Sequence, residues 1–380
     1  MADFKKTVEN LLATVDIQIN GPRPWDMQIH NENFYARVLG GGALGLGESY
    51  MDGWWDCEAL DQCMDRLLGG RIDKKVKGSA PAFLWMLLRA KFSNAQSKKR
   101  AYIVGEEHYD TGNDLFALML DNKMNYSCGY WKQAEKLDQA QEDKLDLICR
   151  KMQFEPGMRV LEIGCGWGGF AKYAAENYGV SVHGVTISKE QKKLAEDICK
   201  GLDVTFQLKD YRELDEEYDR IVSIGMFEHV GYKNYREYME VANRCLKDGG
   251  LFLLHTIGRN TSDQSTDAWT NKYIFPNGMT PSAKQVSAAT EDLFQIEDWH
   301  SFGQYYDTTL MAWHDNFQKH WGALEGNYDE RFKRMWQYYL LTAAGSFRAR
   351  RNQLWQLVLS KGGVKGGYSY KNNPRFEQGV

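Results

Sequence analysis

The sequence lacks long apolar runs: no stretch approaches the roughly 18 consecutive apolar residues that a helix needs to cross a bilayer. The charged first residues, 1–6, are not followed by the apolar segment of a secretory signal. We therefore expect a cytoplasmic protein that meets lipid, if at all, from outside the bilayer.

Cysteine is scarce and without pattern. The seven cysteines form no Cys-x-x-Cys pair and have no neighbouring histidines at ligand spacing. A disulfide framework and a zinc site both require such spacing. We expect reduced thiols and no bound metal.

A chain of 380 residues suggests two or three folding units. We expect a small α+β domain over residues 1–88, a basic linker over 89–105 and a larger domain over 106–380. In the first domain we predict a helix to about residue 15, strands at 17–19 and 25–29, and a helix at 32–39 that stops at three glycines. Residues 45–55 contain glycines but no following Lys-Ser or Lys-Thr, so a tight turn against aromatics is favoured over a phosphate loop.

Residues 71–100 carry nine Lys or Arg against one acid, Asp73. The apolar stretch PAFLWMLL (81–88) lies between these charges. A segment lying on an anionic membrane has this composition, and so does a buried helix with a charged, solvated exit. No nucleic-acid-binding module accompanies the charge, so a nucleic-acid partner is not expected.

From residue 106 the pattern alternates between helical stretches and short apolar runs. Runs at 158–163, 180–185, 204–208, 218–224 and 250–257 have the spacing of a parallel sheet with crossover helices. This predicts an α/β domain. Later helices, at 313–318 and 331–359, are expected to cover its pocket.

A glycine-rich turn, GCGWGG (164–169), follows the first predicted strand, which carries Glu162 two residues before the turn. A dinucleotide site would need an acid at the end of the second strand, where this chain has Thr186 and Ile187. The turn instead resembles the nucleotide site of class I S-adenosylmethionine-dependent methyltransferases, which have a Rossmann-like fold. The resemblance implies cofactor contacts at Gly164, Cys165 and Gly166.

Three further residues are predicted to hold the cofactor. The second strand does not end in an acid that could bind the ribose. We predict that Gln191, in the following helix, binds the ribose instead. Asp210 and Tyr211 follow the third strand, where they could accept from the adenine amino group and lie against the ring. An ordinary capped turn is the structural alternative for this pair.

Seven motifs in order resemble the cyclopropane-fatty-acyl-phospholipid synthases and, more distantly, the mycolic acid cyclopropane synthases. They are EHYDTGNDLF (107–116), NYSCGY (125–130), GCGWG (164–168), GMFEHV (225–230), HTIG (255–258), YIFPNG (273–278) and YYDTTL (305–310). The resemblance covers residues 98–359, and residues 44–55 are similar to the extra N-terminal domain of the longer bacterial enzymes.

This resemblance implies a catalytic domain at 106–380, with helical lid elements, that uses S-adenosylmethionine and a bound bicarbonate ion as base. It implies that the ion is held by Cys128, Glu228, His255, Tyr306 and the backbone of Ile257. It also implies cofactor contacts at Tyr126, Ser127, Thr186 and Ile187. Taken singly, each of these residues could be an ordinary core or turn residue.

The implied reaction transfers a methylene to the cis double bond of a phospholipid acyl chain, through a carbocation that bicarbonate deprotonates. A methyltransferase that leaves a branched or methylene-bearing chain is the alternative. The implied partners are unsaturated phospholipid at the inner membrane face, met peripherally, and a second copy in a homodimer. One departure is Ala343, where many relatives carry a cysteine, so the chemistry is expected not to need that thiol.

Overall fold

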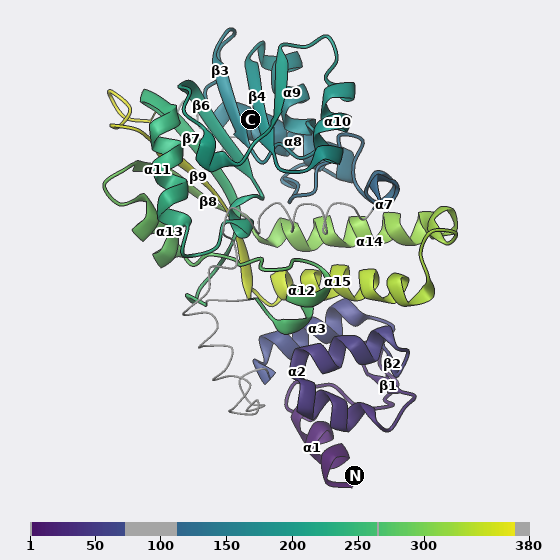
Figure 1. Cartoon of the computed structure of the whole chain (residues 1–380). Coiled ribbons are helices and arrows are strands. Elements are labelled where there is room, and N and C mark those ends of the chain that lie inside the picture. The colour runs from purple at the N-terminus through teal and green to yellow at the C-terminus, as the bar shows by residue number, and fades with distance from the viewer. Residues whose placement is uncertain (1, 73–111, 264–265, 369–380) are drawn as a thin grey trace. The chain divides into compact units, whose positions relative to one another are not determined.

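The computed structural model describes residues 2–72, 112–263 and 266–368 (Figure 1). The predicted linker, and the predicted membrane contact within 73–100, lie outside the described residues, as do the predicted boundaries at 88 and 105. Two compact units are present. Unit 1 comprises Met1–Asn94, Gln264–Asn277 and Tyr306–Asn352, and unit 2 comprises Ala95–Asp263, Gly278–Tyr305 and Gln353–Val380.

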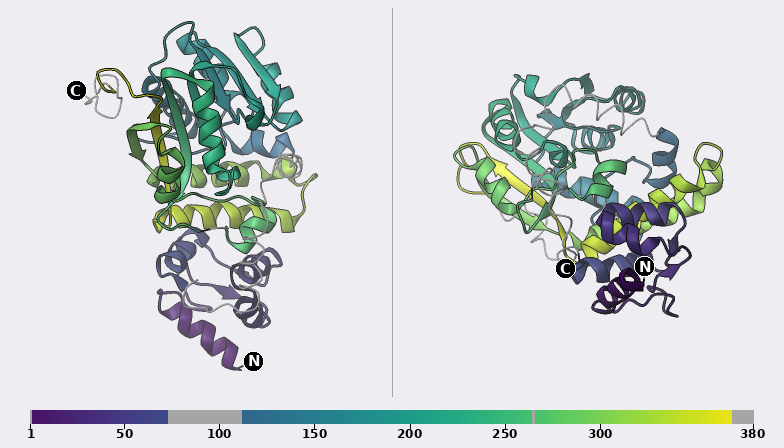
Figure 2. Two further views of the ribbon diagram at one scale, coloured as in Figure 1. Left: turned by 60° about the vertical axis from the view of Figure 1, so that its left-hand side comes forward. Right: turned by 60° about the horizontal axis from the view of Figure 1, so that its bottom comes forward.

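Unit 2 is built on a seven-stranded sheet with helices on both faces (Figures 1 and 2). In their order across the sheet, the strands are β5 (Val204–Leu208), β4 (Ser181–Thr186), β3 (Arg159–Ile163), β6 (Tyr218–Ile224), β7 (Leu246–Arg259), β9 (Asn352–Ser360) and β8 (Gln295–Ser301). β5, β4, β3, β6 and β7 pair in parallel, whereas β8 and β9 are antiparallel. The five predicted parallel strands are confirmed.

The predicted helix over 331–359 is wrong in its last part, because α15 (Glu330–Arg348) ends early and β9 follows. β9 lies between two other strands and is buried over Leu354–Ser360. A strand buried on both faces is a continuous apolar run, which periodicity alone does not separate from a buried helix.

Side-chain alternation along the strands divides the core of unit 2 into two layers. Leu161 packs in a cluster with residues of α11 (Tyr235–Cys245) and α13 (Ala283–Thr290). Its neighbour Val160 packs in a second cluster with residues of α8 (Leu137–Lys151), α9 (Gly169–Tyr178) and α10 (Lys189–Ile198). α7 (Asn113–Met119) precedes these helices in the chain.

In its described residues, unit 1 is mainly helical and contains a small antiparallel sheet of β1 (Gln28–Ile29) and β2 (Trp55–Asp56). Its helices are α1 (Ala2–Ala13), α2 (Phe34–Met51), α3 (Leu60–Gly69), α12 (Ala268–Tyr273), α15 and most of α14 (Gln304–Leu324). The strand predicted at 17–19 is a single bridge from Ile19 to Met27. Within the described parts of both units, no helix combines the length and apolar character needed to span a membrane.

The predicted glycine stop is only a kink in α2. Gly42 has φ +53° and ψ −132°, after which the helix resumes and continues to Met51. The tight turn predicted over 45–55 is therefore wrong for its first half, which is helical. The predicted aromatic packing is present, because a Cβ on Gly47 would lie 2.3 Å from Cδ1 of Trp269.

We expect Gly47→Ala to lower the free energy of unfolding by about 1–3 kcal/mol, because the added methyl overlaps the Trp269 ring. Gly40→Ala is the matched control: Gly40 lies in the same helix, and no described atom lies within 4 Å of where its added methyl would be, so alanine should be neutral or stabilising. Urea unfolding followed by tryptophan fluorescence measures both. Equal stability of the two variants would contradict the close packing at Gly47.

Candidate active site

The carboxyl ends of the five parallel strands meet at one edge of the sheet in unit 2, where α/β proteins usually bind ligands. Most predicted site residues follow one of these ends. They are Gly164, Cys165 and Gly166 after β3, Ile187 and Gln191 after β4, Asp210 and Tyr211 after β5 and Glu228 after β6, together with Thr186, which ends β4, and His255 and Ile257 on β7.

The glycine turn after β3 is tightly fixed on one side and open on the other. Gly164 has φ +83° and Gly166 has φ +52°, a region that favours glycine. The amides of Gly164 and Cys165 donate to the carbonyl of Val185, at 3.0 and 3.1 Å. A Cβ on Gly164 would lie 2.7 Å from Met226 Cγ, whereas no described atom lies within 4 Å of a Cβ on Gly166. A ligand could therefore approach the backbone at Gly166.

Glu162 lies on β3 directly before this turn and is almost fully buried. Its Oε2 has no hydrogen-bond partner among the described residues. Burial raises the pKa of Glu162 well above its usual range, against a lowering effect from the charge of Lys144. A buried oxygen without a partner is costly unless a ligand donates to it, so Glu162 fits the ammonium of an amino-acid group. The sequence drew attention to this acid but did not assign it a role.

Thr186 and Gln191 form one buried pair. The Thr186 hydroxyl donates to Oε1 of Gln191 at 2.8 Å, and Ser188 caps α10 by accepting from the Gln191 amide at 3.2 Å. The side-chain amide nitrogen of Gln191 is then the group that could donate to a ribose hydroxyl. Ile187 lies between these residues in the same loop.

Asp210 caps a short 3-10 turn by accepting from the amide of Arg212 at 3.0 Å. The ring of Tyr211 meets Tyr238 edge-on, with centroids 4.9 Å apart, and burial raises the pKa of Tyr211 to about 12. The capped turn that was the structural alternative is therefore present. Adenine contacts by this pair stay a prediction.

Two of the groups predicted to hold the base meet directly at the ends of β6 and β7. The amide of Ile257 donates to Oε1 of Glu228 at 2.6 Å. Oε2 of Glu228 and Nε2 of His255 have no hydrogen-bond partner among the described residues. Both side chains are buried, so each needs a polar group that the described protein does not supply.

The protonation of this pair is set mainly by burial. Burial raises the pKa of Glu228 to about 7, against the lowering effect of the hydrogen bond from the Ile257 amide. Burial, with the charges of Lys144 and Lys151, lowers the pKa of His255 well below its usual value. His255 is therefore a neutral imidazole, and Glu228 changes charge near neutral pH.

Gln356 on β9 is a residue that the sequence did not indicate, because β9 was predicted as helix. Its Nε2 lies 3.2 Å from Nδ1 of His255, and both side chains are buried. An amide nitrogen that donates to Nδ1 leaves the imidazole hydrogen on Nε2. The partnerless Nε2 is then a donor, as an anion would require.

Cys128 is fully buried, and its thiol donates to the carbonyl of Gly129 at 3.2 Å. Ser127 accepts at its hydroxyl from Lys144 Nζ at 3.0 Å, and the ring of Tyr126 meets Phe116 edge-on at 5.1 Å. These three predicted residues therefore share one loop of unit 2.

Tyr306 lies on α14 and belongs to unit 1, whereas the other predicted site residues belong to unit 2. Within unit 1 its ring packs against Phe347 at 4.6 Å and Trp313 at 6.0 Å. Its part in the site stays a prediction.

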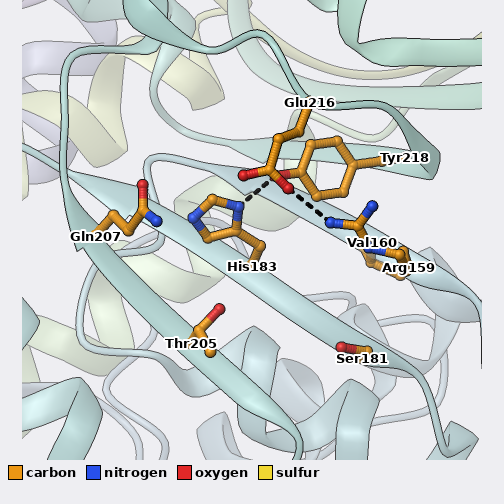
Figure 3. Close-up of a pocket in the computed structure, with 8 residues that line it drawn as sticks. All are labelled: Arg159, Val160, Ser181, His183, Thr205, Gln207, Glu216 and Tyr218. Atoms are coloured by element: carbon orange, nitrogen blue, oxygen red, sulfur yellow. Dashed lines mark hydrogen bonds and ion pairs between the residues drawn. The ribbon is translucent and has the colours of Figure 1, made fainter.

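A separate cavity of about 130 Å³ lies near the amino-terminal ends of β3, β4, β5 and β6 (Figure 3). Its wall includes an ion pair of 2.8 Å between Arg159 and Glu216, and a hydrogen bond between His183 and Tyr218. These groups lie toward the opposite end of the strands from the glycine turn. The cavity is therefore not part of the candidate site.

Comparisons with known proteins show the family and the fold of the chain. The family model for mycolic acid cyclopropane synthetase matches residues 96–357. The cyclopropane-fatty-acyl-phospholipid synthase of Escherichia coli K12 is 55% identical over 360 residues, which is 95% of this chain and 94% of that protein. A probable fatty acid methyltransferase of Pseudomonas putida is 36% identical over 267 residues, or 67% of this chain and 68% of that one.

Among solved structures, a mycolic acid cyclopropane synthase in complex with SAH and CTAB is similar with a TM-score of 0.64 and 31% identity. The match covers 68% of this chain and 98% of that one. The predicted α/β methyltransferase fold is thereby confirmed.

The raised pKa of Glu228 predicts that this carboxyl lowers the free energy of unfolding by an amount that depends on pH. Between its ordinary pKa of 4.5 and about 7, the native state binds more protons than the unfolded state, so this carboxyl lowers stability as pH rises. We expect the unfolding free energy of Glu228→Gln, relative to the unsubstituted protein, to rise by up to about 3 kcal/mol between pH 5 and pH 8.

Urea unfolding without ligands, at a series of pH values, measures this difference. Glu216→Gln is the control, since Arg159 lowers the pKa of Glu216 and keeps it ionised across the same range. A difference for Glu228→Gln that does not change with pH would show that Glu228 is not desolvated as described.

Proposed function

This chain belongs to the mycolic acid cyclopropane synthetase family, and we infer from that premise that it builds cyclopropane rings on lipid acyl chains with S-adenosylmethionine. We propose that its substrate is the cis double bond of an unsaturated chain in a membrane phospholipid. The observation that carries the proposal is the pair of partnerless buried groups, on Glu228 and His255, beside the glycine turn of a methyltransferase sheet.

The residues of the turn fit the proposed cofactor. Gly166 leaves room for close approach to the backbone, and Glu162 offers a buried oxygen to an ammonium group. When bound, the cofactor supplies an electrophilic methyl on a sulfonium. The net reaction adds CH₂ to the alkene and releases S-adenosylhomocysteine and a proton.

The chain must also hold a base for that proton, and we propose bicarbonate. Glu228 Oε2 would accept the hydroxyl of the ion, and His255 Nε2 would donate to one of its oxygens. The Ile257 amide contributes by fixing the other oxygen of Glu228, at 2.6 Å. Bicarbonate would supply a base there, and the role of Glu228 and His255 would be to keep that base oriented toward the methyl group that loses a proton.

Aromatic rings near His255 suit a cationic intermediate. Phe302 lies edge-on to His255 at 6.0 Å, and Tyr130 meets both Phe302 and Tyr305 edge-on at 5.4 and 5.5 Å. Aromatic faces attract positive charge and exclude water. Tyr130 and Tyr305 belong to two of the seven motifs, NYSCGY and YYDTTL, whereas Phe302 lies in none of them.

The remaining parts of the proposal concern partners. We propose peripheral contact with the inner membrane face, supported by the basic and apolar composition of residues 71–100. A homodimer is proposed from the family resemblance alone.

Incubation with S-adenosylmethionine and vesicles of unsaturated phospholipid should yield acyl chains heavier by one CH₂, detected by mass spectrometry. Vesicles of fully saturated phospholipid are the control and should gain nothing, because they have no alkene. The proposal fails if the unsaturated chains stay unchanged while calorimetry shows that S-adenosylhomocysteine binds.

A second candidate function is favoured by the similarity to a probable fatty acid methyltransferase. The same site would then leave a methyl branch or an exocyclic methylene instead of a ring. NMR of the product separates these outcomes, since cyclopropane protons resonate apart from those of a branch.

Glu228→Gln should retain affinity for S-adenosylhomocysteine but lose activity by about 10²–10⁴-fold, because an amide cannot orient the base as a carboxylate does. Calorimetry and product formation measure the two effects. Turnover within twofold of the unsubstituted protein would remove Glu228 from the mechanism.

A further inference from the structure

Helix α8 carries two fully buried lysines, Lys144 and Lys151. Lysine is almost never fully buried unless its charge is paired. Lys151 follows this rule, with an ion pair of 3.2 Å to Asp298 and a contact of 3.2 Å to His300 Nδ1.

Lys144 has a different environment. Its Nζ donates to Oδ1 of Asn125 at 3.1 Å and to Oγ of Ser127 at 3.0 Å, and both acceptors are neutral. In residues 112–263 and the other described ranges, no carboxylate forms an ion pair with it. Burial accordingly lowers the pKa of Lys144 to about 8, although Asp121 raises it. Burying an amine that has only neutral hydrogen-bond partners costs free energy of folding. We therefore asked what its two hydrogen bonds contribute.

The two acceptors of Lys144 flank Tyr126 in the loop before α8. The same loop is held from two other directions. Asp121 accepts from the backbone and side-chain amides of Asn125 at 2.7 and 2.8 Å, and Gln141, one turn before Lys144, donates to the carbonyl of Ser127 at 2.8 Å. Gln141 also donates to the carbonyl of Asn125 at 3.5 Å, so it bridges the backbone of the loop, whereas Lys144 joins the side chains of Asn125 and Ser127.

This loop lies against the candidate site. A Cβ on Gly225, at the end of β6, would lie 3.9 Å from Cβ of Ser127. The charge of Lys144 acts on Cys128 and on Glu162 in the same unit, and it contributes to the state of His255. The amine therefore contacts the loop that carries Tyr126, Ser127 and Cys128, which are proposed to hold the cofactor and the base.

We propose that Lys144 is a positioning residue, which joins Asn125 to Ser127 and thereby holds Tyr126, Ser127 and Cys128 in the arrangement that the transferase site needs. The significance of those three residues rests on the proposed function. Lys144 itself is not proposed to touch substrate or cofactor.

The two lysines of α8 provide a matched test. Lys144→Met and Lys151→Met remove the same ammonium group from the same helix at equal burial, but from different partners. Hydrogen exchange of the unliganded protein should become faster over residues 121–130 in Lys144→Met, and over 295–301 in Lys151→Met.

Calorimetry with S-adenosylhomocysteine gives the second readout. We expect its Kd to rise at least tenfold in Lys144→Met and to stay within threefold in Lys151→Met, even where the latter lowers Tm more. If Lys144→Met lowers Tm but leaves both the exchange of 121–130 and the Kd unchanged, the lysine is only structural and the proposal is overturned. Equal rises in Kd for both variants would overturn it too, because general destabilisation would then explain them.

Lys144→Gln, with Lys151→Gln as its control, replaces the methionine pair if the latter does not fold, and the same outcomes apply. Neither readout needs lipid turnover. An unsubstituted protein that binds S-adenosylhomocysteine without making cyclopropane products would defeat the proposed function, while the exchange and affinity data would still decide the role of Lys144.

Discussion

Parallel pairing of β5, β4, β3, β6 and β7 is the constraint on which the rest of unit 2 depends. Because parallel strands share a direction, their following loops all leave at one edge, and residues distant in the sequence arrive there together. Gly166 and His255 are 89 positions apart in the sequence, yet both lie at this edge because their strands run in the same direction. No single loop has to be long to reach the site.

The edge is also where the unit leaves buried polar atoms without partners. Glu162 Oε2, Glu228 Oε2 and His255 Nε2 are each without a described hydrogen-bond partner, although most buried polar groups in proteins have one. Each unpaired buried atom costs free energy in the unliganded protein. A ligand that forms the missing hydrogen bond recovers this free energy as binding affinity. The same three atoms therefore destabilise the unliganded protein and select for a ligand with both donors and acceptors.

Much of this unit could be predicted from the sequence, since the five parallel strands are short Val, Ile and Leu runs with a glycine turn after the first. Features that depend on tertiary neighbours could not. The run ending in Leu359 forms a strand between two other strands, and this strand places Gln356 beside His255.

Lys144 belongs to a helix with many charged residues, where a lysine normally faces water. Only the fold shows that its partners lie in a loop 17 to 19 residues earlier. In unit 1, α2 continues past its glycines to Met51, and its second part packs through Gly47 against Trp269, which is 222 positions away in the sequence.

The buried charges around this edge form one linked system. Burial raises the pKa of both Glu162 and Glu228, and it lowers that of Lys144 and His255, so desolvation disfavours every charge in the unliganded site. In a low-dielectric region of this kind, a carboxylate gains far more from a neighbouring cation than it would in water. A sulfonium bound near Glu228 would favour its ionised form, which is the form proposed to accept the hydroxyl of a bound ion. By linkage, a ligand that favours the carboxylate binds more tightly when the proton has left. On the proposed function, binding of the cofactor and of the base would therefore be thermodynamically coupled through Glu228.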